Sequence, residues 1–194
     1  MARDEGKEVT PTDSDNERLQ SYVKRPEIRS LTISHESGHA VLAEYFGHEV
    51  RDVVTKPKVV RSTDGEIVGV TGGSIEIGWR PLDLNDPDFD DRIQERATIL
   101  MGGRAAEELT HPELAEASSW ALDVEQFKDK VKGWRTETEM DALLEEGYRK
   151  AKSLLRDPKI SEQHTRLRNF LATEPVFNGP NGQYLCRVMK GLSP

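Results

Sequence analysis

The chain has 194 residues and a formal net charge of −8, with 35% hydrophobic and 32% charged residues. This length suffices for one domain with a real core, and the low apolar fraction predicts that part of the chain lies outside that core. The acidic balance argues against nucleic acid as a partner, because phosphate binding needs a basic face. The single cysteine, Cys186, excludes an intramolecular disulfide and a zinc cluster built from cysteines.

Residues 1–20 are polar and nearly free of large apolar side chains, which predicts a disordered tail before a folded domain in residues 21–194. No stretch approaches the about 20 apolar residues that span a bilayer. The N-terminus also lacks the apolar segment of a secretory signal. We therefore expect a protein without a membrane span, located in the cytoplasm.

Residues 27–46 are predicted to form one long helix, beginning near Pro26 and stopping at Gly47. Residues 35–39 within it read His-Glu-Ser-Gly-His. Histidines four apart share one helix face, where neutral imidazoles can bind one zinc ion while Glu36 serves as a general base. So short a motif also occurs by chance, with both histidines at the surface or satisfied in a core. The apolar flanks favour burial, and buried imidazoles need a partner such as a metal.

Residues 50–79 alternate apolar and polar positions, which predicts a small β-sheet of about three strands with a hairpin turn at Asp64-Gly65. The glycine-rich run at residues 71–74 is typical of a sheet edge that another backbone approaches, and a simple turn is the alternative. An acidic loop with two prolines follows at residues 81–91.

The helical period returns in residues 91–109, where Gly102-Gly103 permits close helix packing, and His111-Pro112 ends this helix. Three more helices are predicted at residues 113–132, 137–156 and 161–173, before a tail with turns. The expected fold class is α+β and mostly helical, with a zinc helix, a small sheet of about three strands and a bundle of four to five helices.

Several segments resemble the FtsH-type zinc peptidases, the proteolytic domain of membrane-anchored AAA proteases. The sequence TISHESGHAVLAEYFGH at residues 32–48 is similar to the zinc helix of that family, and MGGRAAEEL at residues 101–109 is similar to a second characteristic helix. Residues 143–157 resemble the penultimate helix of the family, and FLATEPVFNGPNGQYL at residues 170–185 resembles its closing segment. The likeness spans residues 27 to about 188.

The resemblance implies zinc as the cofactor and an aspartate as the third ligand, on the helix that follows GGRAAEEL. Asp123 is the matching residue, although Trp120, Ala121 and Leu122 stand before it in place of the small polar residues that the family has there. Glu116 and Glu125 stay open as alternative ligands, and a solvated helix residue is the alternative reading of Asp123.

The resemblance further implies a zinc metalloendopeptidase, a hydrolase that cleaves peptide bonds in unfolded or extended polypeptides. His35, His39 and Asp123 would bind the metal, and Glu36 would be the catalytic base. The family binds its substrate as a strand added to an edge strand, here the segment Val68–Ile75. The residues expected to contact the substrate are Val70, Thr71, Gly72, Gly73 and Ser74.

Glu107 and Glu108 are candidate partners for the second ring nitrogens of the histidines. Alternatively, they are surface charges or pair with Arg104.

The alternative function is a catalytically silent zinc-binding adaptor or decoy subunit for an AAA protease, and Glu36 argues against it. The family carries membrane segments and an AAA ATPase before the peptidase. The chain shows neither, so we expect a free-standing domain that needs either a separate AAA ATPase or substrates already unfolded. Hexameric rings are typical of the family, and the sequence leaves a monomer and a homo-oligomer open.

Overall fold

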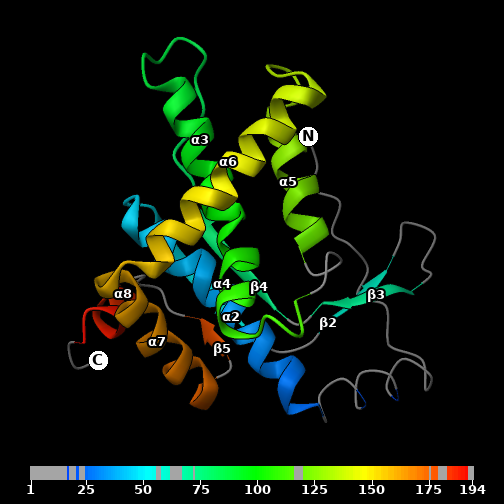
Figure 1. Ribbon diagram of the computed structural model, residues 1–194, viewed down its shortest axis with the longest axis vertical. Helices are drawn as coiled ribbons and strands as arrows, with labels where there is room; N and C mark the ends of the chain where they lie inside the picture. The colour runs from blue at the N-terminus through cyan, green and yellow to red at the C-terminus, as the bar shows by residue number, and fades with distance from the viewer. Residues whose placement is uncertain are drawn as a thin grey trace.

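The computed structural model describes residues 17, 21, 25–55, 58–61, 67–71, 73–115, 120–174, 176–178 and 183–191. Most of the predicted tail at residues 1–20 lies outside these residues, as do the turn at Asp64-Gly65, Gly72 and Glu116. The described part is mostly helical with small antiparallel sheets, which confirms the predicted α+β class (Figure 1).

The helices are α2 (Pro26–Tyr45), α3 (Phe89–Leu100), α4 (Gly102–Thr110), α5 (Ala121–Val131), α6 (Glu137–Arg156), α7 (Pro158–Thr173) and α8 (Gln183–Met189). The strands are β1 (Glu49–Val54), β2 (Lys58–Arg61), β3 (Ile67–Thr71), β4 (Ser74–Gly78) and β5 (Val176–Asn178).

Helix α2 is the central element, and it packs against α4, α7, α3 and the strands β1 and β4. It matches the predicted helix: Pro26 occupies its first turn, and Gly47, at a φ of 73°, lies just beyond its end. Every residue from Leu31 to Ala43 is buried, in line with the burial that the apolar flanks of the histidine motif favour. Neighbours surround the helix on all sides, so its polar side chains must find partners inside the protein.

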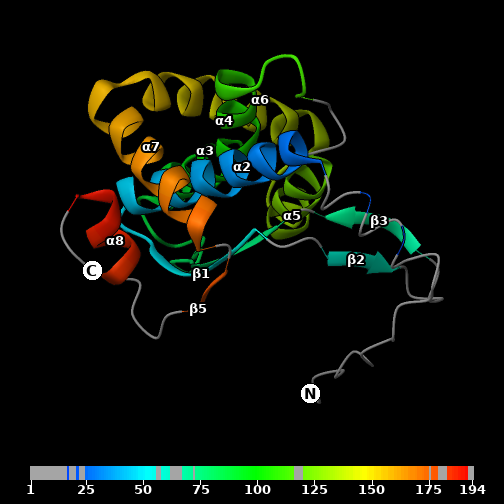
Figure 2. The ribbon, with the colours of Figure 1, turned by 90° about the horizontal axis from the view of Figure 1, so that it is seen from below.

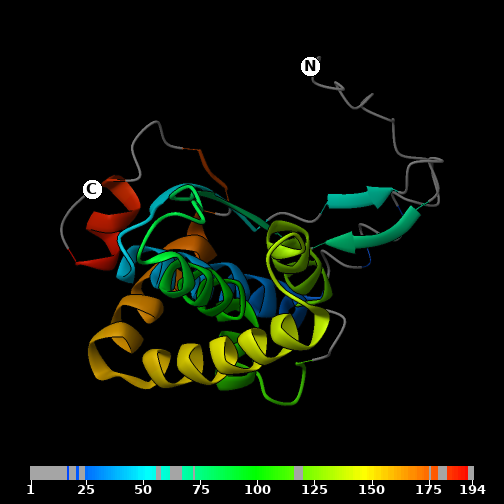
Figure 3. The ribbon, with the colours of Figure 1, turned by 90° about the horizontal axis from the view of Figure 1, so that it is seen from above.

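A three-stranded antiparallel sheet with the order β4-β1-β5 lies beside α2. Its central strand buries Val50 and Val53. The strands β2 and β3 form a separate two-stranded sheet, which projects from the helical body (Figure 2 and Figure 3). The prediction of a single sheet within residues 50–79 is therefore wrong, because the strands of this segment belong to two sheets. The third strand of the sheet beside α2 is β5, which lies in the tail, where the sequence indicates only turns. A strand of three residues forms through its distant partners and leaves no periodic signal, so the sequence does not reveal it.

Helices α3 and α4 divide the helix predicted at residues 91–109, with the break at Met101. Directly after it, Gly102 meets Gly38 of α2 so closely that a Cβ on Gly38 would lie 2.5 Å from the Gly102 carbonyl oxygen. The predicted close packing at Gly102-Gly103 is therefore confirmed. The contact fixes α4 across α2 at the level of the two histidines.

The helix predicted at residues 113–132 is shorter than expected. Residues 112–114 form a turn that begins at Pro112, and α5 begins only at Ala121. By contrast, α6 begins and ends as predicted, because a capping box between Thr136 and Glu139 starts it. Phe127 of α5 is fully buried in a cluster with side chains of α3 and α6. Among the described residues, no helix is both long and apolar enough to cross a membrane.

Candidate metal centre

His35 and His39 lie side by side on one face of the buried helix α2. His35 and His39 are 9% and 1% exposed. The Nδ1 atom of His35 is 2.8 Å from Oε1 of Glu107, and Nδ1 of His39 is 2.8 Å from the carbonyl oxygen of Ile99. Both partners are pure acceptors, so each Nδ1 must carry the proton that it donates. Each Nε2 is therefore left with a lone pair, which is the form of histidine that binds metals.

Asp123 of α5 completes a cluster of three ligand atoms. The two Nε2 atoms are 2.9 Å apart, and Oδ2 of Asp123 lies 3.2 Å from Nε2 of His35 and 3.5 Å from Nε2 of His39. Ligands about 2.0–2.1 Å from a tetrahedral zinc ion lie about 3.3 Å from one another, so these separations fit one shared ion.

The three ligand atoms of this cluster are all electron-pair donors, which favours a bound cation. Two imidazole lone pairs and a carboxylate oxygen converge without a hydrogen-bond donor between them, and Oδ2 of Asp123 is a buried atom with no hydrogen-bond partner. Three acceptors at such distances repel one another unless a positive charge lies among them. The residues present therefore fit a divalent metal such as zinc.

The pKa shifts of His35 and Asp123 also indicate that positive charge is favoured in this cluster. Without a metal ion, a proton would take its place: burial acts to lower the pKa of His35, but the adjacent carboxylates of Asp123 and Glu107 outweigh burial and raise this pKa well above its ordinary value. Burial acts to raise the pKa of Asp123, but the adjacent imidazoles of His39 and His35 hold this pKa well below its usual range. A metal ion would replace the proton in this negatively polarised cluster.

Glu36 lies next to the ligands and is not one of them. Its carboxylate is buried, and burial raises its pKa, which the charges of His35 and His39 oppose. A carboxylate with a raised pKa is a better proton acceptor at neutral pH. Gly73, just before β4, lies so close that a Cβ there would be 2.5 Å from Oε1 of Glu36. The backbone at the start of β4 therefore adjoins the predicted base.

A cleft opens onto this cluster between β4 and α5. One side consists of the ligands, Glu36 and the β4 residues Ser74 and Ile75. The remaining lining is largely apolar and comes from Ile77, Trp79, Leu100, Leu122 and Gln126. Strand β4 is the edge strand of its sheet, paired with β1 among the described strands. The cleft thus combines a candidate metal site, a base, a strand edge and an apolar wall.

Gly103 on α4 lies close to the edges of both imidazoles that carry the Nε2 atoms. A Cβ at this position would lie 2.5 Å from Cε1 of His35 and 2.5 Å from Nε2 of His39. Sequence reasoning assigned Gly103 to helix packing and missed this contact with the histidines. The backbone oxygen of Ile99 was missed as well, because a carbonyl acceptor leaves no trace in the sequence.

The structure separates the predicted substrate residues. Gly73 and Ser74 line the cleft, whereas Val70 and Thr71 belong to β3, where they pair with β2. The single edge strand expected across Val68–Ile75 is therefore wrong, because residues up to Thr71 belong to the other sheet. Gly72 lies outside the described residues.

The structure also distinguishes among the carboxylates that the sequence left as alternative metal ligands or histidine partners. Glu125 is exposed on α5 and does not join the cluster of His35, His39 and Asp123, while Glu116 lies outside the described residues. Of the two candidate partners for the histidines, Glu107 contacts Nδ1 of His35. Glu108 instead accepts a hydrogen bond from Arg104.

Comparison with known proteins yields a partial likeness. No family model matches the chain. The chain is 32% identical over 106 residues to the ATP-dependent zinc metalloprotease FtsH 1 of Sorangium cellulosum (strain So ce56). The matched stretch covers 55% of this chain and 15% of that protein. The likeness indicates an FtsH-related segment, and the chain spans only a small part of the relative's length.

Proposed function

We propose that this chain is a zinc-dependent metalloendopeptidase. The observation that carries the proposal is the convergence of His35, His39 and Asp123 from two helices, with the buried carboxylate of Glu36 beside them. The partial likeness to a zinc metalloprotease supports the same chemistry. The alternative function, a zinc-binding adaptor without activity, would have no use for a buried carboxylate that faces the cleft.

Each residue of the site has a separate role in this proposal. A zinc ion bound by the three ligands would polarise a peptide carbonyl and acidify a water molecule. Glu36 would accept the proton of that water and pass it to the leaving amine, for which its raised pKa is suited. Glu107 and the Ile99 carbonyl keep the imidazoles in the tautomer that binds metal.

We infer that the substrate binds in an extended conformation along β4. Among the described strands β4 lies at the edge of its sheet, where a peptide backbone can be added as a further strand, and Gly73 would place that peptide beside Glu36. The apolar wall around Trp79 and Leu100 would receive one large apolar side chain of the substrate. Substrates would therefore be unfolded or extended polypeptides, because a folded chain does not offer a free strand of this kind.

Zinc content and proteolysis test the proposed function together. Full-length protein is loaded with zinc, dialysed and assayed for bound metal and for cleavage of casein, an unfolded protein. We expect about one zinc per chain, cleavage by the wild type, and a loss of at least about 100-fold in Glu36→Gln with zinc retained. Glu125→Gln is the matched control, because Glu125 is exposed on α5 and lies outside the cluster. Zinc binding without cleavage by the wild type would favour the adaptor, and absence of zinc binding would refute both functions.

The partners are part of the proposal. We propose that a separate AAA ATPase delivers unfolded chains to the cleft, and that copies of this chain assemble into a ring, as in the family that the sequence resembles. Cleavage of casein at the same rate with and without an added ATPase would argue that substrates reach the cleft without a motor. The mass in solution, measured by light scattering, distinguishes a monomer from a hexamer.

A further inference from the structure

Asp123 reaches the metal centre from a helix that is anchored mainly at its other end. It lies in the first turn of α5, whereas the fully buried side chains of this helix, Phe127 and Val131, lie one and two turns further along. Those two side chains pack in the cluster shared with α3 and α6. The first turn has two exposed residues, Ala121 and Leu122, so burial of apolar side chains there contributes little to its position.

The side chain of Trp120 provides a second anchor for this first turn. Trp120 occupies the N-cap position of α5, and its side chain makes no capping hydrogen bond. The indole ring instead packs on Arg104 of α4, whose guanidinium carbon lies 4.8 Å from the ring centroid. A guanidinium at this distance over an indole is attracted by the ring quadrupole, and the contact strengthens as water is excluded. Trp120 therefore ties the start of α5 to α4.

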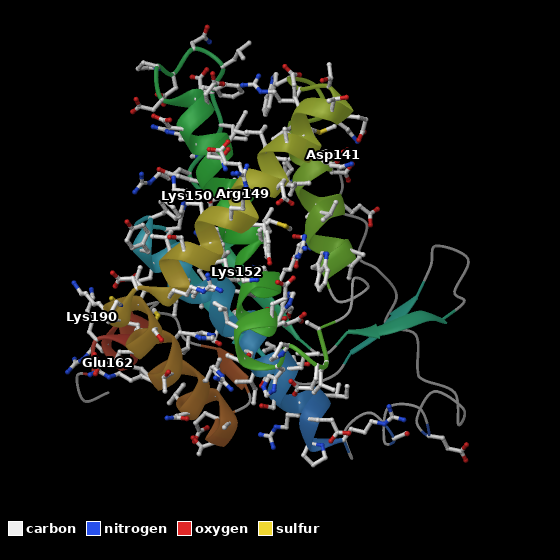
Figure 4. The ribbon with its side chains drawn as sticks, in the orientation of Figure 1. Asp141, Arg149, Lys150, Lys152, Glu162 and Lys190 are labelled. Carbon is white, nitrogen blue, oxygen red and sulfur yellow. The ribbon has the colours of Figure 1, made fainter. Side chains whose placement is uncertain are left out.

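Arg104 is itself held in place by α6. Its guanidinium lies 4.0 Å from the ring centroid of Tyr148, and its Nε donates a hydrogen bond of 3.0 Å to Glu108. Lys152, labelled in Figure 4, donates a hydrogen bond of 2.8 Å to Glu108, and the hydroxyl of Tyr148 donates to the same carboxylate. These contacts hold the pKa of Glu108 at about 2, against the opposing effect of burial, so it stays ionised beside Arg104. A side chain so held is a rigid platform for Trp120.

Helix α4 thus has residues that contact or position all three ligands. Gly103 lies against the imidazoles of His35 and His39, and Glu107 orients the imidazole of His35. We propose that Arg104, acting through Trp120, is a positioning residue that holds Asp123 in register with the two histidines. This inference rests on the proposed zinc site and adds the way in which its third ligand is held. Because α4 crosses α2 at a glycine contact, it can set the distance between ligands from two different helices.

Zinc affinity tests the inference without any measurement of proteolysis. The full chain is titrated with zinc against a chelating indicator, as wild type, Trp120→Ala and Trp120→Phe. We expect Trp120→Ala to bind zinc about 10-fold more weakly, as is typical of residues that orient a metal ligand. Trp120→Phe should restore most of the affinity, because it keeps a ring face for Arg104. Trp134→Ala is the matched control, since Trp134 packs on Phe89 beyond the other end of α5 and should leave zinc affinity unchanged.

A double-mutant cycle separates positioning from a general loss of structure. In the Asp123→Asn background, Trp120→Ala should cause no further loss of zinc affinity, because the ligand that it positions is already removed. If Trp120→Ala does not fold, Arg104→Lys serves in the same cycle, since lysine keeps the charge but lacks the planar face. Wild-type affinity in both Trp120→Ala and Arg104→Lys, or an equal loss in the Asp123→Asn background, would overturn the inference. If the wild type binds no zinc, the proposed function itself fails.

Discussion

Replacement of Gly103 by alanine tests the geometry of the metal centre most directly. The added Cβ would lie 2.5 Å from both His35 Cε1 and His39 Nε2, and 2.6 Å from His35 Nε2. Carbon atoms in contact prefer separations of about 3.5–4.0 Å, so the imidazoles or α4 must move by about 1 Å. Metal ligands tolerate deviations of only about 0.2 Å from ideal distances. The methyl group therefore cannot be accommodated with both Nε2 atoms in place.

The effect on zinc binding should far exceed the effect on folding. Overpacking of a well-packed site costs about 1–3 kcal/mol, while replacing glycine by alanine within a helix returns about 1 kcal/mol. We therefore expect Gly103→Ala to lower the free energy of unfolding of the zinc-free protein by about 0–2 kcal/mol. We expect zinc affinity to fall by at least about 10–100-fold, as in other sites whose ligands are displaced.

Two measurements separate these effects. Urea denaturation followed by circular dichroism gives the stability of the zinc-free protein, and competition with a chelating indicator gives the zinc affinity. Gly133→Ala is the matched control, because a Cβ at Gly133 would meet nothing within 4 Å. Wild-type zinc affinity in Gly103→Ala would refute the close contact between α4 and the two imidazoles.

Two further substitutions probe the surroundings of the ligands. Glu107→Gln removes the charge that Nδ1 of His35 contacts, and we expect zinc affinity to fall about 10-fold; an unchanged affinity would show that the carboxylate is dispensable. Burial lowers the pKa of His164 to about 4, so the folded state keeps it neutral while the unfolded chain takes up a proton near pH 6.5. As the pH falls from about 7 to about 4.5, zinc-free wild type should thus lose about 2–3 kcal/mol more stability than His164→Gln in urea denaturation; parallel pH profiles would contradict this burial effect.

Helix α2 could be predicted well because its signals are local. Pro26 and Gly47 mark its two ends, and the helical period places His35 and His39 on one face whatever surrounds them. The capping box that begins at Thr136 made α6 equally predictable. The extent of burial of α2 could not be predicted, since it depends on how many elements pack around the helix.

The sheets show where local signals fail. Residues 50–79 were correctly expected to form strands, but alternation along one strand does not say which strand is its neighbour. Pairing placed β3 with β2, and placed β4 at the edge of a sheet completed by β5 from the tail. The predicted substrate residues are consequently divided: Gly73 and Ser74 line the cleft, whereas Val70 and Thr71 belong to the other sheet.

The residue types at the centre of the candidate site follow from the local sequence: two imidazoles one helical turn apart, and a carboxylate between them in the sequence. Which other groups join them depends on how the helices pack. Asp123 was one of several acidic residues in its region, and it became the third member of the cluster because α5 directs it toward α2 while Glu125 faces solvent. The physical reason is that spacing along one helix fixes distances within that helix, whereas the distance between α2 and α5 is set by packing through α4, at Gly103 and Arg104.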